Sequence, residues 1–311
     1  MENKKIVPVF FSADEYYMPF LAVALTSIKK YANADREYQI HILCTGIDEA
    51  SCQPVLDMQT DNIKINFVNI ADKAKQIQSV MRCRDYYTSA IYFRLFIPDL
   101  FPQYEKAVYL DCDIVLLEDI ANLYDIEIGD NYIGAVADQA VAEVPQFRDY
   151  TKNALDIEAD DYFNSGVIVL NLQRLRAINF YKTFYGILSS YDFTVAPDQD
   201  CLNLICKDKV YYYGAEWNAM PIGAEGNPTP KLIHYNLAMK PWHYDGVSYE
   251  DYFWDYAKQT PYYEAIVAQK KAFTPEMAMR DKEGGEKLIA LAKSEADNPN
   301  NYFRSMQKKR A

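Results

Sequence analysis

The sequence predicts an α/β fold built on a central, mostly parallel mixed sheet with helices on both faces. Three observations support this prediction. Short apolar strands alternate with helical segments through the first half of the chain, half of the 311 residues are hydrophobic, and charged residues make up an ordinary 24%. Parallel strands need a crossover connection, usually a helix, so the alternation favours a parallel sheet covered on both sides. Such sheets bind ligands beyond the carboxyl ends of their strands.

The apolar pattern places the elements in chain order. We expect strands at residues 5–11, 39–44, 63–70, 107–110, 131–138, 166–171, 210–214 and 231–235. We expect helices at residues 18–31, 48–60, 88–97, 172–190 and 199–206. The third of these helices should end before Pro98, because the residue that precedes a proline is disfavoured in the helical region. Residues 1–260 contain no linker-like stretch and are predicted to form one domain.

The end of the sequence differs in composition. Residues 261–311 are charged and predict a helical tail. Breaks in this tail are expected at Pro275, Gly284–Gly285 and Pro299. An amphipathic stretch at 287–293 and a basic end favour peripheral contact with a membrane. Many acidic residues in the same tail favour a solvated appendage or a homo-oligomer contact, and both interpretations stay open.

Charge and cysteine content bound the class of protein. The net charge of −12 argues against broad binding of nucleic acid, which needs a basic surface. An anionic substrate can still bind where a metal ion or a few cations are placed locally. The six cysteines form no CxxC pair, so we expect reduced thiols. The N-terminal segment does not have the pattern of a signal peptide, and no stretch reaches the ~18 apolar residues of a membrane-spanning helix. We therefore expect a cytoplasmic protein.

Residues 106–119, KAVYLDCDIVLLED, lead an apolar strand directly into two aspartates. In an extended chain residues i and i+2 point the same way, so Asp111 and Asp113 face one side and Cys112 the other. Two convergent carboxylates repel each other unless a cation lies between them, and such oxygen ligands suit Mg²⁺ or Mn²⁺. This ion would accept phosphate oxygens from a nucleotide. The triplet alone is weak evidence, since a second one occurs at 198–200 and a solvated turn is the plain alternative.

Residues 234–243, HYNLAMKPWH, contain two of the three histidines of the chain. His234, at the end of an expected strand, could complete a metal site as a neutral imidazole. Lys240 could meet a diphosphate as a point charge. A histidine on its own is more often structural, so these roles depend on the two aspartates lying nearby.

Six segments occur in the order and approximate spacing of the family-eight glycosyltransferases, which the chain resembles from about residue 6 to about residue 260. They are FFSADEYYMPFLAVALTSI (10–28), YFRLFIP (92–98), KAVYLDCDIVLLEDI (106–120), YFNSGVIVLNL (162–172), PDQDCLN (197–203) and HYNLAMKPWH (234–243). The chain is similar to bacterial lipopolysaccharide α-galactosyl- and α-glucosyltransferases of that family. The resemblance implies a single nucleotide-sugar-binding domain of the GT-A type and a metal-dependent, retaining transferase that uses a UDP-sugar.

The resemblance also implies roles for single residues. Asp111, Asp113 and His234 would hold Mn²⁺, or Mg²⁺, on the UDP diphosphate, and Lys240 would contact its phosphates. Arg94 would contact the donor sugar and the diphosphate, with a solvated cation on a helix surface as its alternative. The full set implied to bind the nucleotide is Ser12, Ala13, Asp14, Tyr17, Arg94, Asp111, Cys112, Asp113 and Lys240.

The first segment would hold the nucleoside. By resemblance, Asp14 would accept a hydrogen bond from the uracil N3–H and Tyr17 would stack on the ring; the alternative for Asp14 is a helix N-cap. Two positions depart from the family pattern. Relatives often carry glycine at Leu237, so a backbone contact to phosphate would require Leu237 to present its N–H with a negative φ. Relatives carry asparagine at Tyr16, a change that would remove a ribose contact.

The residues implied to surround the transferred sugar are Asp138, Asn164, Asp198, Gln199 and Asp200. Gly166 would permit close approach to this group. The alternative for Asp198 and Asp200 is the first turn of a helix, where carboxylates complement the dipole. Retention requires either a double displacement, for which Asp200 is the nearest nucleophile, or a front-side attack on the same face. We favour the front-side route, in which Gln199 stabilises an oxocarbenium-like transition state and the departing phosphate takes the acceptor's proton.

The sequence thus predicts transfer of galactose or glucose from UDP-galactose or UDP-glucose to a saccharide acceptor, such as a cell-surface glycan, with an α-linkage. We expect a location in the cytoplasm or at the inner face of the plasma membrane. One alternative is a haloacid-dehalogenase-like phosphatase, which also opens on an apolar strand and an Asp-x-Asp triplet. It is disfavoured because the triplet lies a third of the way along the chain and Val115 continues an apolar run. The other alternative is a nucleotide-sugar-binding protein without turnover.

Overall fold

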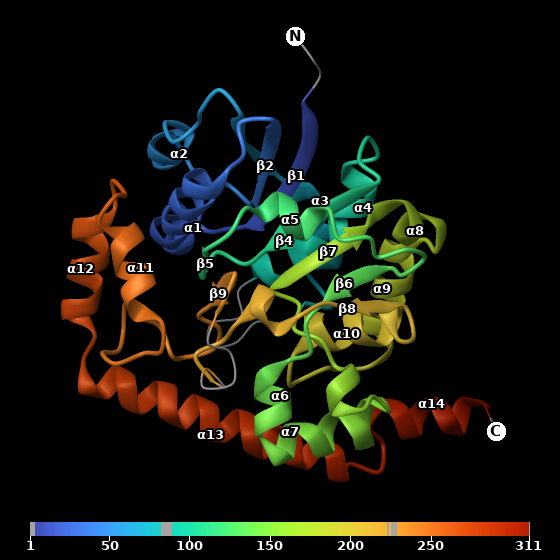
Figure 1. The fold of residues 1–311 in the computed structure, drawn as a ribbon. Coiled ribbons are helices and arrows are strands. Elements are labelled where there is room, and N and C mark those ends of the chain that lie inside the picture. Colours follow the sequence, from blue (N-terminus) through green and yellow to red (C-terminus); the bar gives the residue numbers. More distant parts are fainter. Residues whose placement is uncertain (1–3, 82–88, 223, 225–228, 311) are drawn as a thin grey trace.

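The computed structural model describes residues 4–81, 89–222, 224 and 229–310. A seven-stranded sheet in the order β3-β2-β1-β4-β7-β6-β8 forms the centre of the fold (Figure 1). Its strands are β1 (Lys5–Ser12), β2 (Arg36–Cys44), β3 (Ile63–Asn69), β4 (Lys106–Leu110), β6 (Ile133–Ala135), β7 (Val167–Asn171) and β8 (Val210–Tyr212). Among the described strands of this sheet, β7 alone runs against the others, because it pairs antiparallel with β4 and β6. The prediction of a mostly parallel mixed sheet is confirmed.

Helices cover both faces of this sheet (Figure 1). One face carries α1 (Met18–Tyr31), α2 (Glu49–Leu56) and α5 (Ile120–Tyr124). The other carries α3 (Ala71–Ile77), the 3₁₀ helix η2 (Ser89–Phe96), α8 (Leu172–Ala177), α9 (Phe180–Ser190) and α10 (Pro197–Cys206). Phe10 and Phe11 show the division, because neighbours along β1 point to opposite faces and each is fully buried in a different core.

A second sheet has two antiparallel strands, β5 (Ile114–Leu116) and β9 (Leu232–His234). β5 begins four residues after the end of β4, and Ile114 lies opposite His234. The strand expected at 231–235 therefore forms, but it pairs with β5 rather than joining the main sheet. β5 was not predicted as a strand of its own. Its pairing brings His234 to the carboxyl end of β4.

Two expected helices have a different form. Residues 89–96 are 3₁₀ rather than α-helical, and Pro98 lies in the first turn of α4 (Ile97–Leu100), where a missing N–H breaks no helical hydrogen bond. Residue 88, where that helix was expected to begin, lies outside the described residues. The helix expected at 172–190 is two helices, because Asn179 adopts the left-handed conformation with φ of 50° between them.

Short helical elements link the rest of the domain. They are η1 (Glu15–Tyr17), α6 (Gln139–Glu143), α7 (Pro145–Tyr150), the π-helical turn η3 (Thr151–Leu155), η4 (Ala159–Asp161), η5 (Ala215–Asn218) and α11 (Glu250–Ala257). The five described cysteines are free and buried, and Cys83 lies outside the described residues.

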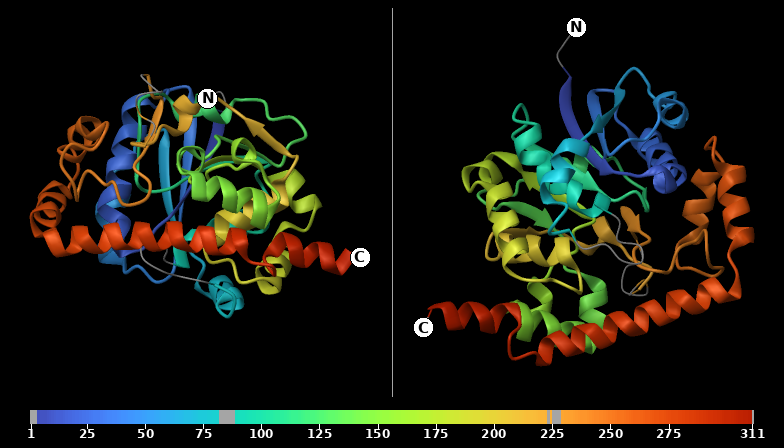
Figure 2. Two further views of the ribbon diagram at one scale, coloured as in Figure 1. Left: turned by 90° about the horizontal axis from the view of Figure 1, so that it is seen from below. Right: turned by 180° about the vertical axis from the view of Figure 1, so that it is seen from behind.

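The tail consists of α12 (Tyr263–Ala272), α13 (Pro275–Asp297) and α14 (Tyr302–Arg310). α13 runs through Gly284–Gly285, so the break expected there is wrong. In both views of Figure 2, α13 extends along the domain from α12 to α14. It packs on α7 and η3, and Ala292 and Ala296 are buried there. Within the described ranges, no helix combines the length and apolarity needed to cross a membrane.

Candidate active site

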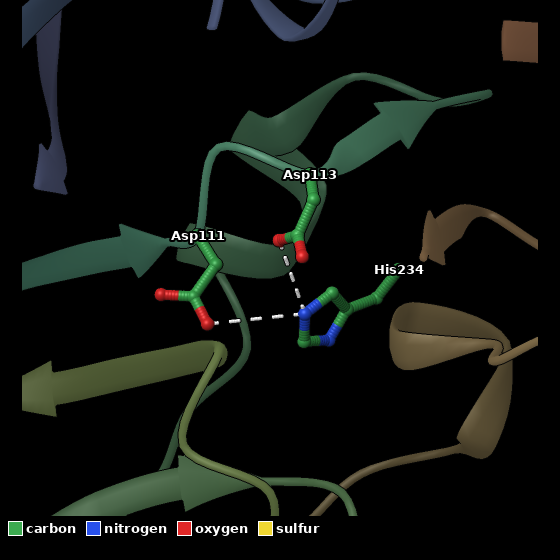
Figure 3. Close-up of side chains that lie close together, drawn as sticks. All are labelled: Asp111, Asp113 and His234. Carbon is green, nitrogen blue, oxygen red and sulfur yellow. Dashed lines mark ion pairs between the residues drawn. The ribbon is translucent and has the colours of Figure 1, made fainter. Parts of the chain in front are cut away.

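The Asp-x-Asp triplet forms the link between β4 and β5, and β9 brings a histidine to it. The His234 Nε2 lies 3.3 Å from Asp113 Oδ1 and 3.8 Å from Asp111 Oδ2. Figure 3 shows both carboxylates turned toward the imidazole. One ligand atom from each residue can be chosen so that all three lie within 4.8 Å of one another. Two carboxylates and an imidazole in this arrangement are a donor set that suits Mn²⁺ or Mg²⁺.

The partner of His234 supports this fit. Its Nδ1 lies 3.0 Å from Asn218 Oδ1, which can only accept a hydrogen bond. The proton is therefore assigned to Nδ1, and the lone pair of Nε2 faces the carboxylates of Asp111 and Asp113. Three electron-rich groups meet there, an arrangement that a cation would satisfy.

A glycine makes this approach of side chains feasible. Gly166 immediately precedes β7, and its carbonyl accepts a 2.7 Å hydrogen bond from the Asp111 amide. A Cβ atom at Gly166 would lie 2.3 Å from His234 Cε1 and 2.5 Å from Asp111 Oδ2. No real contact is that short, so any larger residue would displace one of the two candidate ligands.

Lys240 neutralises one of the aspartates. Its Nζ donates to Asp113 Oδ2 and also to the Tyr235 carbonyl at 2.5 Å. Burial alone would raise the pKa of Asp113, but the ion pair with the Lys240 ammonium outweighs burial and holds that pKa well below its usual range. Asp113 is only 8% exposed, so it is not the solvated turn residue of the alternative interpretation.

Arg94 forms an ion pair with the other aspartate of the triplet, Asp111. Its Nη2 donates to Asp111 Oδ1 at 3.0 Å, and its Nε lies 3.6 Å from Asp198 Oδ2. Nη1 donates to the Ser165 carbonyl, and the guanidinium lies 4.3 Å from the centre of the Tyr109 ring. At 4% exposure Arg94 is not a surface cation with a solvated tip, so that alternative is wrong. The site therefore pairs each carboxylate of the triplet with its own buried cation.

A chain of amide hydrogen bonds extends from the histidine toward the residues expected at the sugar. Asn218 Nδ2 donates to Asn164 Oδ1 at 3.0 Å, and Asn164 Nδ2 donates to Asp138 Oδ2 at 3.0 Å. Gln199 Nε2 donates to the same Asp138 oxygen at 3.0 Å. The structure thus connects Asp138, Asn164 and Gln199 to His234. Asp138 also caps α6, which is why the strand expected at 131–138 ends at Ala135.

The second triplet opens α10, and its three members lie in different surroundings. Asp200 is fully buried and accepts hydrogen bonds from the Tyr150 and Tyr162 hydroxyls, both at 2.7 Å. Burial raises the pKa of Asp200 to about 7. Burial also raises the pKa of Asp198 to about 6, although Arg94 opposes the shift. Gln199 is half-buried, and its Oε1 accepts from the Ser165 amide at 2.9 Å.

We expect Asp200→Asn to flatten the pH dependence of stability. Unfolded aspartate has a pKa near ~3.9. Between about pH 4 and pH 7 the folded protein therefore keeps a proton that the unfolded chain has lost, so the free energy of unfolding falls as pH rises through this window. The contribution of this group is up to roughly 4 kcal/mol. Urea unfolding at several pH values measures it, and parallel curves for wild type and variant would contradict the raised pKa.

The residues expected at the nucleoside lie at the end of β1, beside the end of β4. Ser12 and Ala13 are buried there, and Asp14 caps η1 by accepting from the Tyr17 amide at 3.1 Å. The N-cap interpretation of Asp14 therefore holds for one carboxylate oxygen. Cys112 points away from the carboxylates, and its thiol donates to the Ser12 carbonyl at 3.2 Å. Its side chain thus contacts the end of β1 and leaves only its backbone near the triplet.

Three features of the site were not predicted. Asn218, Ser165 and Tyr109 hold predicted residues in place, but the sequence around Asn218 carries no signal that would single it out. A backbone contact of Leu237 to phosphate would require a negative φ, but the structure has φ of 55°. That condition is not met, because Leu237 adopts the left-handed conformation that favours glycine.

Comparison with known proteins identifies similar glycosyltransferases. The family model described as "Glycosyl transferase family 8" matches residues 8–246. A "Putative glycosyltransferase" of Haemophilus influenzae is 27% identical over 240 residues, covering 76% of this chain and 71% of that protein. The lipopolysaccharide glucosyltransferase WaaO of Escherichia coli K12 is 27% identical over 273 residues, covering 83% and 76%. The crystal structure of the galactosyltransferase LgtC with donor and acceptor sugar analogs has a TM-score of 0.69 at 26% identity, covering 82% of this chain and 96% of that one.

Proposed function

The chain belongs to glycosyl transferase family 8, and from this membership we propose that it transfers galactose or glucose from a UDP-sugar to a saccharide acceptor, with retention of the α configuration. One observation carries the proposal. The side chains of Asp111, Asp113 and His234 converge at the carboxyl end of β4, and the buried cations Arg94 and Lys240 lie on either side of them.

These residues fit a diphosphate. A divalent ion held by Asp111, Asp113 and His234, Mn²⁺ or Mg²⁺, would neutralise charge on the leaving diphosphate. Arg94 and Lys240 offset the charges of Asp111 and Asp113, so the charge of the ion would remain for the phosphate oxygens. Both cations are buried, so electrostatic attraction at this site is weakly screened. The site thus offers positive charge to an anionic ligand within a chain whose net charge is −12.

The end of β1 is proposed to hold the nucleoside. Asp14 uses one carboxylate oxygen as an N-cap, and the other makes no hydrogen bond to the residues that the structure describes. That oxygen can accept from the N3–H of uracil. Tyr17 is half-buried beside it, so its ring can pack against the base. Ser12, Ala13 and the backbone of Cys112 would line the adjoining space.

The surroundings of the second triplet favour the front-side route. A nucleophilic carboxylate must reach the anomeric carbon, but both oxygens of Asp200 accept tyrosine hydrogen bonds in the interior. We assign Asp200 a positioning role. Gln199 is half-buried, and Ser165 and Asp138 fix its amide, so its carbonyl dipole can stabilise positive charge on the sugar. The departing phosphate then takes the proton of the acceptor hydroxyl, while Asp138, Asn164 and Asp198 would bind sugar hydroxyls.

The phosphatase alternative is not supported. The family match over residues 8–246 is to glycosyltransferases rather than to phosphatases. A saccharide of the cell surface is the acceptor class we propose, since the similar protein WaaO is described as a lipopolysaccharide glucosyltransferase.

Binding of different nucleotides tests the identity of the proposed donor. We expect thermal unfolding of the purified protein to shift upward with UDP and Mn²⁺, and less with GDP, CDP, TDP or with EDTA in place of the metal. A ligand at ~100 times its dissociation constant adds about 2.7 kcal/mol to the free energy of unfolding. No shift with any nucleotide, in a folded protein, would contradict the proposal.

A turnover screen with UDP-galactose and UDP-glucose then tests the transfer. The anomeric coupling constant of the product, read by NMR, should show an α-linkage. Binding without turnover on any saccharide would favour a nucleotide-sugar-binding protein. In the same screen Gln199→Ala should lose most activity, and near-full turnover would remove the role proposed for Gln199.

A further inference from the structure

We infer that Lys270, in the tail helix α12, is a positioning residue for the donor site and that the tail is part of the apparatus that binds the UDP-sugar. The inference rests on the proposed function and concerns the segment 240–245, which carries Lys240. It assigns a task to the tail that neither membrane contact nor solvation explains.

Lys270 holds the segment 240–245 in place through hydrogen bonds to its backbone carbonyls. Its Nζ donates to the Pro241 carbonyl at 3.0 Å and to the Tyr244 carbonyl at 3.1 Å. It also pairs with Asp245 at 2.7 Å, but that carboxylate is 96% exposed, so the pair adds little. The ammonium lies 4.9 Å from the centre of the Trp254 ring, which further fixes its position. The Lys270 ammonium thus links the two ends of the turn at residues 241–244.

The turn that Lys270 closes is built on Lys240. The Lys240 carbonyl accepts from the His243 and Tyr244 amides at 3.0 and 2.9 Å. Trp242, within the turn, is buried and stacks on Phe20 of α1 at 3.8 Å between ring centres. A shift of this turn would therefore move the backbone of Lys240, whose ammonium is held on Asp113.

Neighbouring tail residues reach the same region. Gln269 Nε2 donates to the Tyr16 hydroxyl at 2.8 Å, and Tyr16 lies next to the proposed uracil-stacking Tyr17. Phe273, directly after α12, stacks on His243 with 4.3 Å between ring centres and an angle of 7°. α12 and the residue after it therefore bridge the two segments proposed to bind the nucleoside and the diphosphate. The Tyr16 hydroxyl makes one of these bridges.

The decisive variant is Lys270→Met, which keeps the aliphatic stem and removes the charge and its donors. Lys271→Met is the matched control, because Lys271 is the next residue of α12, is exposed, and makes no ion pair or side-chain hydrogen bond within the described part of the chain. Titration calorimetry of UDP in the presence of Mn²⁺ measures affinity without turnover. We expect about tenfold weaker binding for Lys270→Met, a similar rise in KM for the donor, little change in kcat, and no change for Lys271→Met.

Conservative replacement separates positioning from folding. Lys270→Arg keeps the charge and should recover most of the affinity, whereas a purely structural role would lower the unfolding temperature without changing UDP affinity well below it. Such unchanged affinity in Lys270→Met would overturn the inference. If Lys270→Met does not fold, Lys270→Gln keeps one donor group and is expected to show an intermediate loss of affinity; wild-type affinity would again overturn the inference. Failure of the wild type to bind UDP would instead overturn the proposed function.

Discussion

Asp113→Asn is expected to abolish the Mn²⁺-dependent stabilisation by UDP and to lower turnover by more than about a hundredfold. Asparagine has nearly the same shape, so the change removes a charge and one metal ligand rather than volume. It also leaves Lys240 buried at 3% exposure without its carboxylate. An unpaired buried charge costs about 3–5 kcal/mol, so the free energy of unfolding should fall as well. Thermal unfolding with and without UDP and Mn²⁺ measures both effects.

Asp255→Asn is the control for that measurement. Asp255 is 73% exposed and pairs with Lys258 at 3.5 Å on the surface of α11. Its replacement should leave stability, UDP binding and turnover unchanged within error. If Asp113→Asn kept the wild-type UDP shift, Asp113 would not be a ligand of a nucleotide-bound ion.

Gly166→Ala is expected to reduce turnover to a few per cent or less and to lower the free energy of unfolding by about 1–3 kcal/mol. The added carbon would meet His234 Cε1 at 2.3 Å and Asp111 Oδ2 at 2.5 Å. The backbone cannot easily withdraw, because the Gly166 carbonyl holds the Asp111 amide and its own amide donates to Asn164 at 3.0 Å. Turnover, together with Mn²⁺-dependent UDP binding, measures the displacement of the candidate ligands.

Gly186→Ala is the matched control for Gly166→Ala. Gly186 lies within α9, and a Cβ atom there would meet nothing within 4 Å. Alanine should stabilise this helix by up to about 1 kcal/mol and leave turnover unchanged. Equal activity in the two alanine variants would show that the space beside Gly166 does not matter to the site.

The predictable part of the site is local in sequence. Asp111 and Asp113 follow an apolar strand, and their spacing alone places both carboxylates on one side. The sheet class was equally accessible, because strands and helices alternate along the chain. The burial of Arg94 could not be predicted from the sequence. An arginine within a short helical segment has the same sequence pattern whether its tip is solvated or paired.

The remaining features depend on contacts between distant segments. The pairing of β5 with β9 joins residues 114–116 to residues 232–234, and the hydrophobic periodicity of the sequence does not predict this pairing. The continuation of α13 through Gly284–Gly285 also depends on contacts with distant segments. Each helical glycine costs about 1 kcal/mol relative to alanine, but the packing of Ala292 and Ala296 on the domain outweighs that local preference.

The reversal of β7 determines which residues lie beside the Asp-x-Asp triplet. In a sheet whose strands all ran alike, the residue before β7 would lie at the amino edge, roughly 16 Å from the carboxyl end of β4 for a five-residue strand. Because β7 runs the other way, the segment that enters it, with Asn164 and Gly166, opens at the same rim as the Asp-x-Asp triplet. The opposite rim is therefore free of these residues. Insertions or fusions there should be tolerated better than at the rim that carries Asp111, Asp113 and His234.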